Sequence, residues 1–350
     1  MKPYLVFGAG AVGSAISAYL ARRGHPVHVV ARKPHVEAIL AQGGLKVVSR
    51  EESFNAPVHA TTDPPSSLDP DTVIFLTVQS PEVKGALDAL ADHLEHPVVT
   101  WQNGIQAEEI AAPRCPVLYG GVVRFTATML DPGEVRLRSP GKLILGRYPG
   151  GANAPDELAE AIAGDLIAAG FETAVSPDIG ADKALKLLVN LVSGPPVLLK
   201  RTGKEPVLAA VQVALLEEAI SVLEAAGIAA HPASGIGQTA EELVAYFRAG
   251  GSAPDTTGKV YNSTWQNLHH RRPRIENDYY HGEIVRIGGR VGVSAPVNAR
   301  ALEVLEEVRR EGLGPEPYDL ATFRERFADI VDLEGMPPAS DSDVEGALEI

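Results

Sequence analysis

YLVFGAGAVG, at residues 4–13, is the stretch that decides the fold of this 350-residue chain. Its first four residues are bulky and mostly apolar, and they predict a short buried strand. The next six match the spacing G-x-G-x-x-G, and Ala11–Arg23 then carries small and apolar side chains at helical spacing, up to Gly24. A strand, a glycine-rich turn and a helix in this order predict the first unit of a dinucleotide-binding sheet.

Each glycine of the turn has its own task at such a site. Gly8 permits the tight turn, Gly10 lets the backbone approach a pyrophosphate, and Gly13 allows the helix to pack closely on the strand. The free N–H groups at the start of the helix would then face the phosphates. The alternative is a glycine-rich turn that binds no ligand. We predict cofactor contacts at the six residues Gly8, Ala9, Gly10, Ala11, Val12 and Gly13.

The second predicted strand, Val27–Ala31, indicates which dinucleotide is bound. NAD sites usually place an acid at the end of this strand, where it accepts hydrogen bonds from the ribose hydroxyls. Here Arg32 and Lys33 follow the strand, and the first acid is Glu37. Because the Arg32 guanidinium can bind a 2′-phosphate through two charge-assisted hydrogen bonds, the sequence favours NADPH. The alternative is that both basic residues are ordinary surface charges.

The first half of the chain alternates β-rich runs with helical stretches, which is typical of a parallel sheet covered by helices. Glu134–Arg138 and Leu143–Leu145, separated by SPGK, predict a hairpin at the sheet edge. The predicted strands of the sheet itself are Tyr4–Phe7, Val27–Ala31, Val73–Val78, Val98–Trp101 and Val117–Val123.

After about residue 179, long helical periods replace the strands. The predicted helices are Ala181–Val192, Pro206–Ala226, Thr239–Arg248, Val260–His270, Glu276–Ile287 and Val297–Arg310. We therefore predict an α/β fold with an N-terminal Rossmann-type, doubly wound parallel sheet at residues 1–178 and a C-terminal all-helical domain at residues 179–332. Residues 333–350 carry acids without Lys or Arg, and they predict a disordered tail.

The composition, 45% hydrophobic and 22% charged, is that of a globular protein. A formal charge of −14 argues against a nucleic-acid partner. No stretch reaches the ~20 unbroken apolar residues of a membrane span, and the strand at the N-terminus leaves no room for a signal peptide. Cys115 is the single cysteine, so a reducing, cytoplasmic location fits best. We expect no metal site, and a homodimer is compatible with the amphipathic helices.

Lys183, Lys186 and Asn190 share one face of the first helix of the second domain, because they stand at i, i+3 and i+7. A lysine at the border of an apolar face can have its pKa lowered by desolvation and act as a general acid. The alternative reading of this spacing is two lysines on the wet face of a packed helix.

Four groups of residues follow one another along the chain. They are Gly8–Gly13, then Trp101–Ile105 with Asn103-Gly104, then Lys186–Asn190, and finally Ser263–Gln266, Glu276–Gly282 and Gly292–Asn298. These groups resemble the successive motifs of ketopantoate reductases. The resemblance covers about residues 1–312 in order and spacing, apart from one extra residue between Gln266 and Glu276.

This resemblance implies a role for each matching residue. Lys186 would protonate the carbonyl oxygen of a small 2-oxo acid while hydride arrives from the nicotinamide of NADPH. Asn103 would contact both cofactor and substrate, and Asn190 and Ser263 would hold the polar groups of the substrate. Glu276 would bind on the cofactor side and help to position Lys186. Since hydride addition develops negative charge on oxygen, a nearby ammonium suits this chemistry.

Two departures from the family pattern bear on the substrate. Gly194 stands where the family commonly has a second asparagine, and the Pro195-Pro196 that follows should end or kink the helix. Gln79 stands where the family tends to place a lysine, on the cofactor side. The leading hypothesis is reduction of 2-dehydropantoate to pantoate in pantothenate biosynthesis. The alternatives are a reductase of a different 2-oxo acid and a non-catalytic NADP(H)-binding regulatory protein.

Overall fold

The computed structural model describes residues 1–49, 51–150, 156–200, 205–250 and 262–333. The chain divides into a first unit, Met1–Lys183, and a second unit, Ala184–Ile350. The predicted second domain begins at the first residue of helix α6 (Ile179–Ser193), whose residues cross this division. Apart from residue 333, the predicted acidic tail lies outside the described residues.

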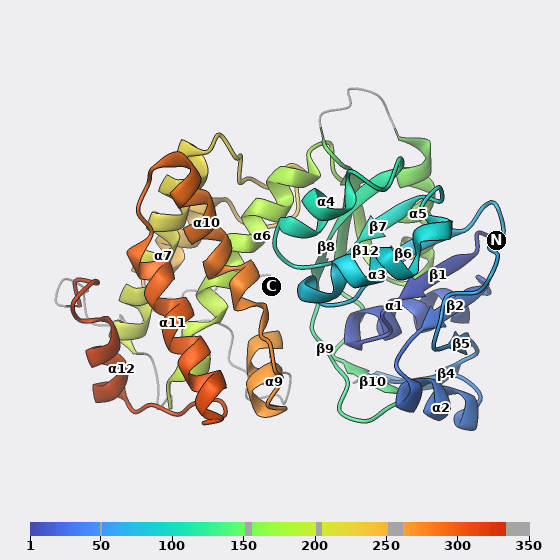
Figure 1. Ribbon diagram of the computed structural model, residues 1–350, viewed down its shortest axis with the longest axis horizontal. Helices are drawn as coiled ribbons and strands as arrows, with labels where there is room; N and C mark the ends of the chain where they lie inside the picture. The colour runs from blue at the N-terminus through green and yellow to red at the C-terminus, as the bar shows by residue number, and fades with distance from the viewer. Residues whose placement is uncertain (50, 151–155, 201–204, 251–261, 334–350) are drawn as a thin grey trace. The chain divides into compact units, whose positions relative to one another are not determined.

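An eight-stranded sheet forms the centre of the first unit (Figure 1). Its order is β12-β11-β8-β7-β6-β1-β2-β5, and all neighbours are parallel except β11 and β8. Because β1 pairs with β2 on one side and β6 on the other, the winding direction changes at β1, as a doubly wound sheet requires. The strands are β1 Tyr4–Phe7, β2 Val27–Val30, β5 His59–Thr61, β6 Val73–Leu76, β7 Val98–Thr100, β8 Leu118–Arg124, β11 Lys142–Arg147 and β12 Glu172–Val175.

Both faces of this sheet are covered, which explains the continuous apolar runs of its inner strands, such as β1 and β6. All four residues of β6 are buried. Tyr4 and Val6 of β1 belong to the core on one face, while Leu5 belongs to the core on the other. Helices α1 (Ala11–Arg22) and α5 (Glu157–Ala169) contribute to the first core, and helices α3 (Val83–Ala89) and α4 (Gln106–Ala111) to the second.

The predicted hairpin at residues 134–145 is wrong. β10 (Glu134–Leu137) lies in a separate four-stranded sheet of order β4-β3-β10-β9, while β11 belongs to the central sheet. The burial patterns give the reason. In β11 the run Leu143–Leu145 is buried throughout and suits a sheet covered on both faces, whereas β10 alternates buried and more exposed residues. The other elements of this region are α2 Lys33–Gln42, β3 Leu45–Val48, β4 Ser53–Ala56 and β9 Ala127–Thr128.

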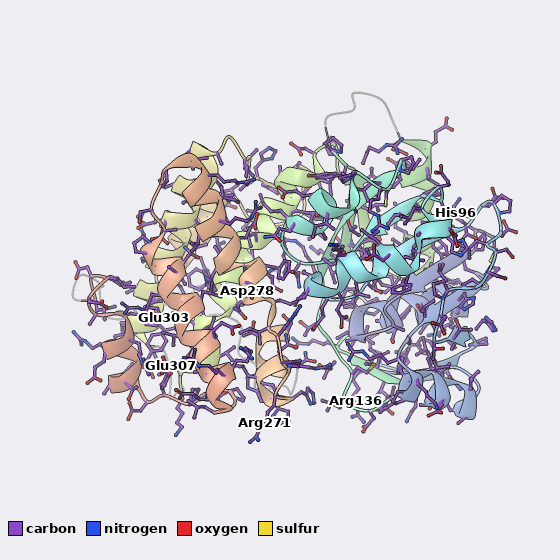
Figure 2. All side chains as sticks on the ribbon, in the orientation of Figure 1. His96, Arg136, Arg271, Asp278, Glu303 and Glu307 are labelled. Atoms are coloured by element: carbon purple, nitrogen blue, oxygen red, sulfur yellow. The ribbon has the colours of Figure 1, made fainter. Side chains whose placement is uncertain are left out.

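The second unit is helical. Its helices are α6 Ile179–Ser193, α7 Pro206–Ala225, α8 Ala240–Arg248, α9 Ser263–His269, α10 His281–Val291, α11 Pro296–Glu311 and α12 Leu320–Phe327, with 3₁₀ turns η3 Pro195–Leu198 and η4 Glu276–Tyr279. On α11, Glu303 and Glu307 are labelled in Figure 2, and Glu307 pairs with Arg326 of α12 at 2.6 Å. This pair adds to the apolar contacts that hold α12, a helix absent from the predictions.

Helix α7 is the apolar centre of the second unit. Among the described residues it alone combines the length and mean hydropathy, 1.7, of a membrane-spanning helix, yet 61% of that stretch is buried within the protein. Val211 and Leu215 of α7 share a core with Val304 and Leu305 of α11. Packing in this core accounts for the apolar character of the helix.

One predicted helix in this unit is interrupted. Glu276–Ile287 divides into η4 and α10, because Tyr280 adopts φ −114° and ψ −85°, outside the helical region. The hydroxyl of Tyr280 donates back to Glu276 Oε2 over 3.0 Å. The residue that interrupts the helix, Tyr280, therefore also contacts Glu276, a predicted site residue.

Candidate functional site

The glycine turn between β1 and α1 has the geometry that its sequence predicts. Gly8 has φ +104°, and a Cβ on it would lie 2.6 Å from the backbone nitrogen of Val78. A Cβ on Gly13 would lie 2.6 Å from the carbonyl oxygen of Gly8 and 2.5 Å from Thr77 Oγ1. A Cβ on Gly10 would meet only the Gly8 oxygen, at 4.0 Å. Packing therefore requires glycine at 8 and 13, whereas position 10 borders open space.

The start of α1 is suited to bind an anion beside Gly10. Gly10 is the N-cap residue, and neither a side-chain cap nor an acid in the first turn neutralises this end of the helix. The partial positive charge of the helix N-terminus is thus available to a phosphate. Open space at Gly10 and an uncapped helix fit the pyrophosphate of a nicotinamide dinucleotide.

Arg32 lies where β2 passes into α2, and it has an acidic partner. Its Nη2 lies 2.7 Å from Glu82 Oε1, and the two side chains are 68% and 47% exposed. Glu82 follows β6 in a short 3₁₀ turn, Ser80–Glu82, that begins just after the half-buried Gln79. Because exposed ion pairs contribute about 0–1 kcal/mol, a phosphate could displace Glu82 from Arg32.

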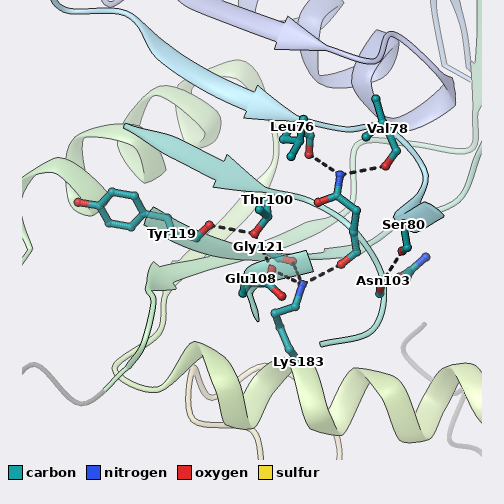
Figure 3. Close-up of polar contacts among 10 residues, drawn as sticks. Leu76, Val78, Ser80, Thr100, Asn103, Glu108, Tyr119, Gly121 and Lys183 are labelled. Atoms are coloured by element: carbon teal, nitrogen blue, oxygen red, sulfur yellow. Dashed lines mark hydrogen bonds and ion pairs between the residues drawn. The ribbon is translucent and has the colours of Figure 1, made fainter. Parts of the chain in front are cut away.

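The turn that carries Asn103 is fixed to neighbouring strands (Figure 3). Gln102 Nε2 donates to the carbonyl oxygens of Leu76, at 2.8 Å, and Val78, at 2.9 Å. Ser80 Oγ donates to the carbonyl oxygen of Asn103 over 3.2 Å. The Asn103 turn is therefore held at the carboxyl ends of β6 and β7, where ligands of doubly wound sheets bind.

Lys183 is buried in the first unit, with all three of its N–H groups engaged. Its Nζ lies 2.7 Å from Glu108 Oε1, 2.8 Å from the Gln102 carbonyl oxygen and 3.3 Å from that of Gly121. The side chains of Lys183 and Glu108 are 2% and 0% exposed. Sequence spacing did not separate Lys183 from Lys186, and it did not single out Glu108. To donate a proton to a substrate, Lys183 would have to break these contacts with Glu108, Gln102 and Gly121.

Hydrogen bonds in the second unit join elements that carry predicted site residues. Two contacts do so: Asn262 Nδ2 donates to the Ser193 carbonyl oxygen, at 2.9 Å, and Thr264 Oγ1 donates to Asn277 Oδ1, at 3.4 Å. They join the start of α9 to the end of α6 and to η4. Ser263 is half-buried at the start of α9. Lys186, Asn190 and Glu276, on α6 and η4, are 6%, 9% and 6% exposed.

The end of α6 at Gly194 carries polar groups of its own. The prediction that Gly-Pro-Pro ends the helix is confirmed, because α6 stops at Ser193 and η3 follows. A Cβ on Gly194 would lie 3.1 Å from His281 Nε2 and 3.5 Å from Asn277 Nδ2. Within the described ranges, those two nitrogens and Asn190 Nδ2 are buried without a hydrogen-bond partner. His281 lies in the Glu276–Gly282 motif, but the resemblance assigned it no role.

The imidazole of His281 makes the stability of the fold sensitive to pH. Burial lowers its pKa from 6.5 to about 4, although its Nδ1 contact with Asn298 Oδ1, at 3.0 Å, acts in the opposite direction. The unfolded chain therefore binds one more proton than the folded chain between these pH values. We expect the free energy of unfolding to fall by ~3 kcal/mol from this residue as pH drops from 6.5 to 4.

Urea unfolding at pH 7 and pH 4.5, compared with the variant His281→Asn, measures this contribution. The variant should lose less stability on acidification than the unmodified chain does. An equal loss in both proteins would show that His281 is not the group that titrates.

Comparison with known protein families matches most of the chain. Residues 4–150 match the family model described as ketopantoate reductase PanE/ApbA, and residues 178–309 match the model of its C-terminal part. The 2-dehydropantoate 2-reductase of Pyrococcus horikoshii is 30% identical over 306 residues, which cover 85% of this chain and 94% of that protein. That of Archaeoglobus fulgidus is 28% identical and covers 87% of this chain and 96% of the relative.

Solved structures share the fold. A PanE/ApbA family ketopantoate reductase from Ralstonia eutropha superposes with a TM-score of 0.72 at 24% identity, over 88% of this chain and 99% of that chain. A D-mandelate dehydrogenase with NADH and anilino(oxo)acetate gives a TM-score of 0.73 at 22% identity, over 89% and 99%. With both family models matched and a curated relative 30% identical over most of its length, this chain belongs to the ketopantoate reductase family of oxidoreductases.

Proposed function

We propose that this chain reduces 2-dehydropantoate to pantoate with NADPH, a step of pantothenate biosynthesis, and that Lys186 is the general acid. The observation that carries the proposal is the family match over both units, together with curated relatives that bear the name 2-dehydropantoate 2-reductase. The site geometry supports it, because Lys186 is buried on α6 while Lys183 is committed to Glu108 and two carbonyl oxygens.

The first unit would hold the cofactor. Gly8–Gly13 would receive the pyrophosphate, Arg32 the 2′-phosphate, and Gln79 and Asn103 the part nearer the nicotinamide. Bound NADPH supplies the hydride. The described contacts of Gln102 and Ser80 then keep the Asn103 turn at the carboxyl ends of the strands.

The second unit would supply the proton and bind the substrate. A carbonyl oxygen that receives hydride on its carbon develops negative charge, which the Lys186 ammonium would stabilise and then neutralise. Glu276 would help to keep Lys186 protonated and oriented, and Tyr280 fixes one oxygen of that carboxylate. Asn190 and Ser263 offer neutral polar groups to the substrate, and Asn103 would complete its contacts.

A steady-state assay tests the proposed function. Purified protein with NADPH and 2-dehydropantoate should oxidise the cofactor, as measured by the loss of absorbance at the nicotinamide band. No oxidation at any practical protein concentration, while the protein is folded and binds NADPH, would contradict the proposal.

Gly194 favours a second candidate, the same reaction on a different 2-oxo acid. The polar groups of His281 and Asn277 lie where the family commonly has an asparagine side chain. Hydrogen-bonding groups of this kind discriminate strongly between substrates with and without a matching polar group. A panel of 2-oxo acids separates the two candidates, because the second predicts a higher kcat/KM for an acid other than 2-dehydropantoate.

Cofactor preference should depend on Arg32 and on its partner Glu82. Arg32→Ala is expected to raise the KM for NADPH by about tenfold, the value of one charge-assisted hydrogen bond, and to leave the KM for NADH nearly unchanged. Glu82→Gln should lower the KM for NADPH a few-fold, because it removes a carboxylate 2.7 Å from the guanidinium.

Initial rates with both cofactors, at saturating 2-oxo acid, measure these changes. Lys33→Ala is the matched control, since Lys33 is a neighbouring exposed cation paired with Glu37 at 3.8 Å. Equal effects of Arg32→Ala on the two cofactors would remove Arg32 from 2′-phosphate recognition.

A further inference from the structure

We propose that Lys183 is a positioning residue for hydride transfer: with Glu108 it fixes the turn that presents Asn103 and the start of the helix that carries Lys186. The inference rests on the proposed function and adds two residues to it. The Lys183 ammonium is engaged by Glu108 and two carbonyl oxygens, so the pair is not placed to contact a ligand itself. They would act through the backbone that they hold.

The first step of the argument is the contact to the turn. Lys183 Nζ donates to the carbonyl oxygen of Gln102, the residue before Asn103, over 2.8 Å. The side chain of Gln102 is separately bound to β6 and its extension through Leu76 and Val78. The backbone and the side chain of Gln102 are thus both fixed, and the orientation of the next residue follows. Figure 3 shows Lys183 reaching up from the helix to this turn.

The second step is the close approach of α6 to the sheet. A Cβ on Gly120 would lie 3.4 Å from Lys183 Cδ, and a Cβ on Gly121 would lie 2.4 Å from the ring of Trp101. Gly120 leaves room for the lysine stem and Gly121 for the Trp101 ring, and the Gly121 carbonyl oxygen accepts a hydrogen bond from the Lys183 ammonium. Lys183 thereby anchors the first turns of α6, the helix that carries Lys186 three residues further on.

The third step is the free-energy cost of burying the Lys183–Glu108 ion pair. Glu108 Oε1 forms the ion pair with the Lys183 ammonium and accepts a hydrogen bond from the Thr100 hydroxyl. Glu108 Oε2, by contrast, is buried without a hydrogen-bond partner among the described residues. Apolar replacements of a buried ion pair are often neutral or stabilising, so such a pair is a poor device for stability alone. An incompletely satisfied pair that nevertheless fixes the Asn103 turn is better explained by geometry at the reaction centre.

Variants that separate stability from positioning test the proposal. Lys183→Met leaves Glu108 buried and unpaired, so both the melting temperature and kcat should fall. The double variant Lys183→Met/Glu108→Leu removes both charges, and its melting temperature should return toward that of the unmodified protein. Its kcat should stay at least about tenfold low, because the Gln102 carbonyl has lost its donor and small misplacements slow a reaction strongly. Its KM for NADPH should change far less.

Tyr4→Phe is the matched control, since it removes another polar contact of the first unit, the part-buried 2.6 Å hydrogen bond from the buried Tyr4 to Asp165. It should lower the melting temperature and leave kcat unchanged. A double variant with recovered stability and full kcat would overturn the proposal.

Hydrogen exchange provides a readout that does not depend on the substrate. Amides of residues 101–105 should exchange faster in the double variant than in the unmodified protein, while those of residues 8–13 keep their rates. Unchanged exchange at residues 101–105 would overturn the positioning role even if the chain acts on none of the 2-oxo acids. The activity of the unmodified protein on the panel of 2-oxo acids tests the proposed function separately.

Discussion

Replacing Lys186 with alanine is expected to lower kcat for reduction of the 2-oxo acid by about 10²- to 10⁴-fold, the usual contribution of a general acid. The reason is that the two lysines of α6 have different proposed roles, with Lys186 as the proton donor and Lys183 as a positioning residue. Lys183 is bound to Glu108, Gln102 and Gly121, and its ammonium has no N–H left for a substrate. Lys186 is buried one turn further along the helix.

The dissociation constant for NADPH should stay within a few-fold in Lys186→Ala, because the glycine turn and Arg32 are untouched. Stopped-flow hydride transfer and fluorescence titration with NADPH measure the two quantities on one preparation. Lys46→Ala is the control: Lys46 pairs with Glu134 at 2.7 Å in the small sheet, and its loss should leave both quantities unchanged. A Lys186→Ala variant with full kcat would remove this residue from the mechanism.

Valine at position 10 is expected to weaken NADPH binding by about 100-fold or more, ~3 kcal/mol, while leaving the fold intact. Gly10 has extended backbone angles, φ −75° and ψ −162°, that any residue adopts, and a Cβ there meets only one protein atom within 4.0 Å. The side chain would instead fill the space next to the α1 N-terminus that we assign to the pyrophosphate.

Gly13→Val provides the contrast to this variant. Its Cβ would lie 2.6 Å from the Gly8 oxygen, so it should destabilise the first unit outright. Thermal melts with and without NADPH distinguish the cases: Gly10→Val should melt like the unmodified protein without cofactor and gain little from it. Normal NADPH stabilisation of Gly10→Val would place the cofactor elsewhere.

The fold was predictable where local pattern decides it. Residues 4–7 form the predicted strand, and Ala11–Arg22 the predicted helix within one residue, because apolar runs and a glycine turn act over short range. The prediction of a hairpin after residue 134 was wrong, because which of two sheets a strand joins depends on which sheet faces are already covered. That is a tertiary property, and SPGK contains no sign of it.

The site was predictable only in part, for the same reason. The spacing i, i+3 put Lys183 and Lys186 on one face but could not show that Glu108, 75 positions earlier, takes the first of them. Likewise the sequence after Arg32 has no acid before Glu37, whereas the fold brings Glu82 to Arg32 across 50 positions. His281 lies within the Glu276–Gly282 motif, but no role was predicted for it, and only the packing beside Gly194 shows its buried imidazole.

A crystal structure of the protein with NADP⁺ and pantoate bound tests most directly whether the ammonium of Lys186 delivers the proton. We predict that Lys186 Nζ lies within hydrogen-bond reach, about 2.6–3.2 Å, of the hydroxyl oxygen on C2 of pantoate. Lys183 should keep its contact with Glu108 in that complex. A complex in which Lys186 points into solvent, or in which Lys183 contacts the C2 oxygen instead, would contradict the assignment.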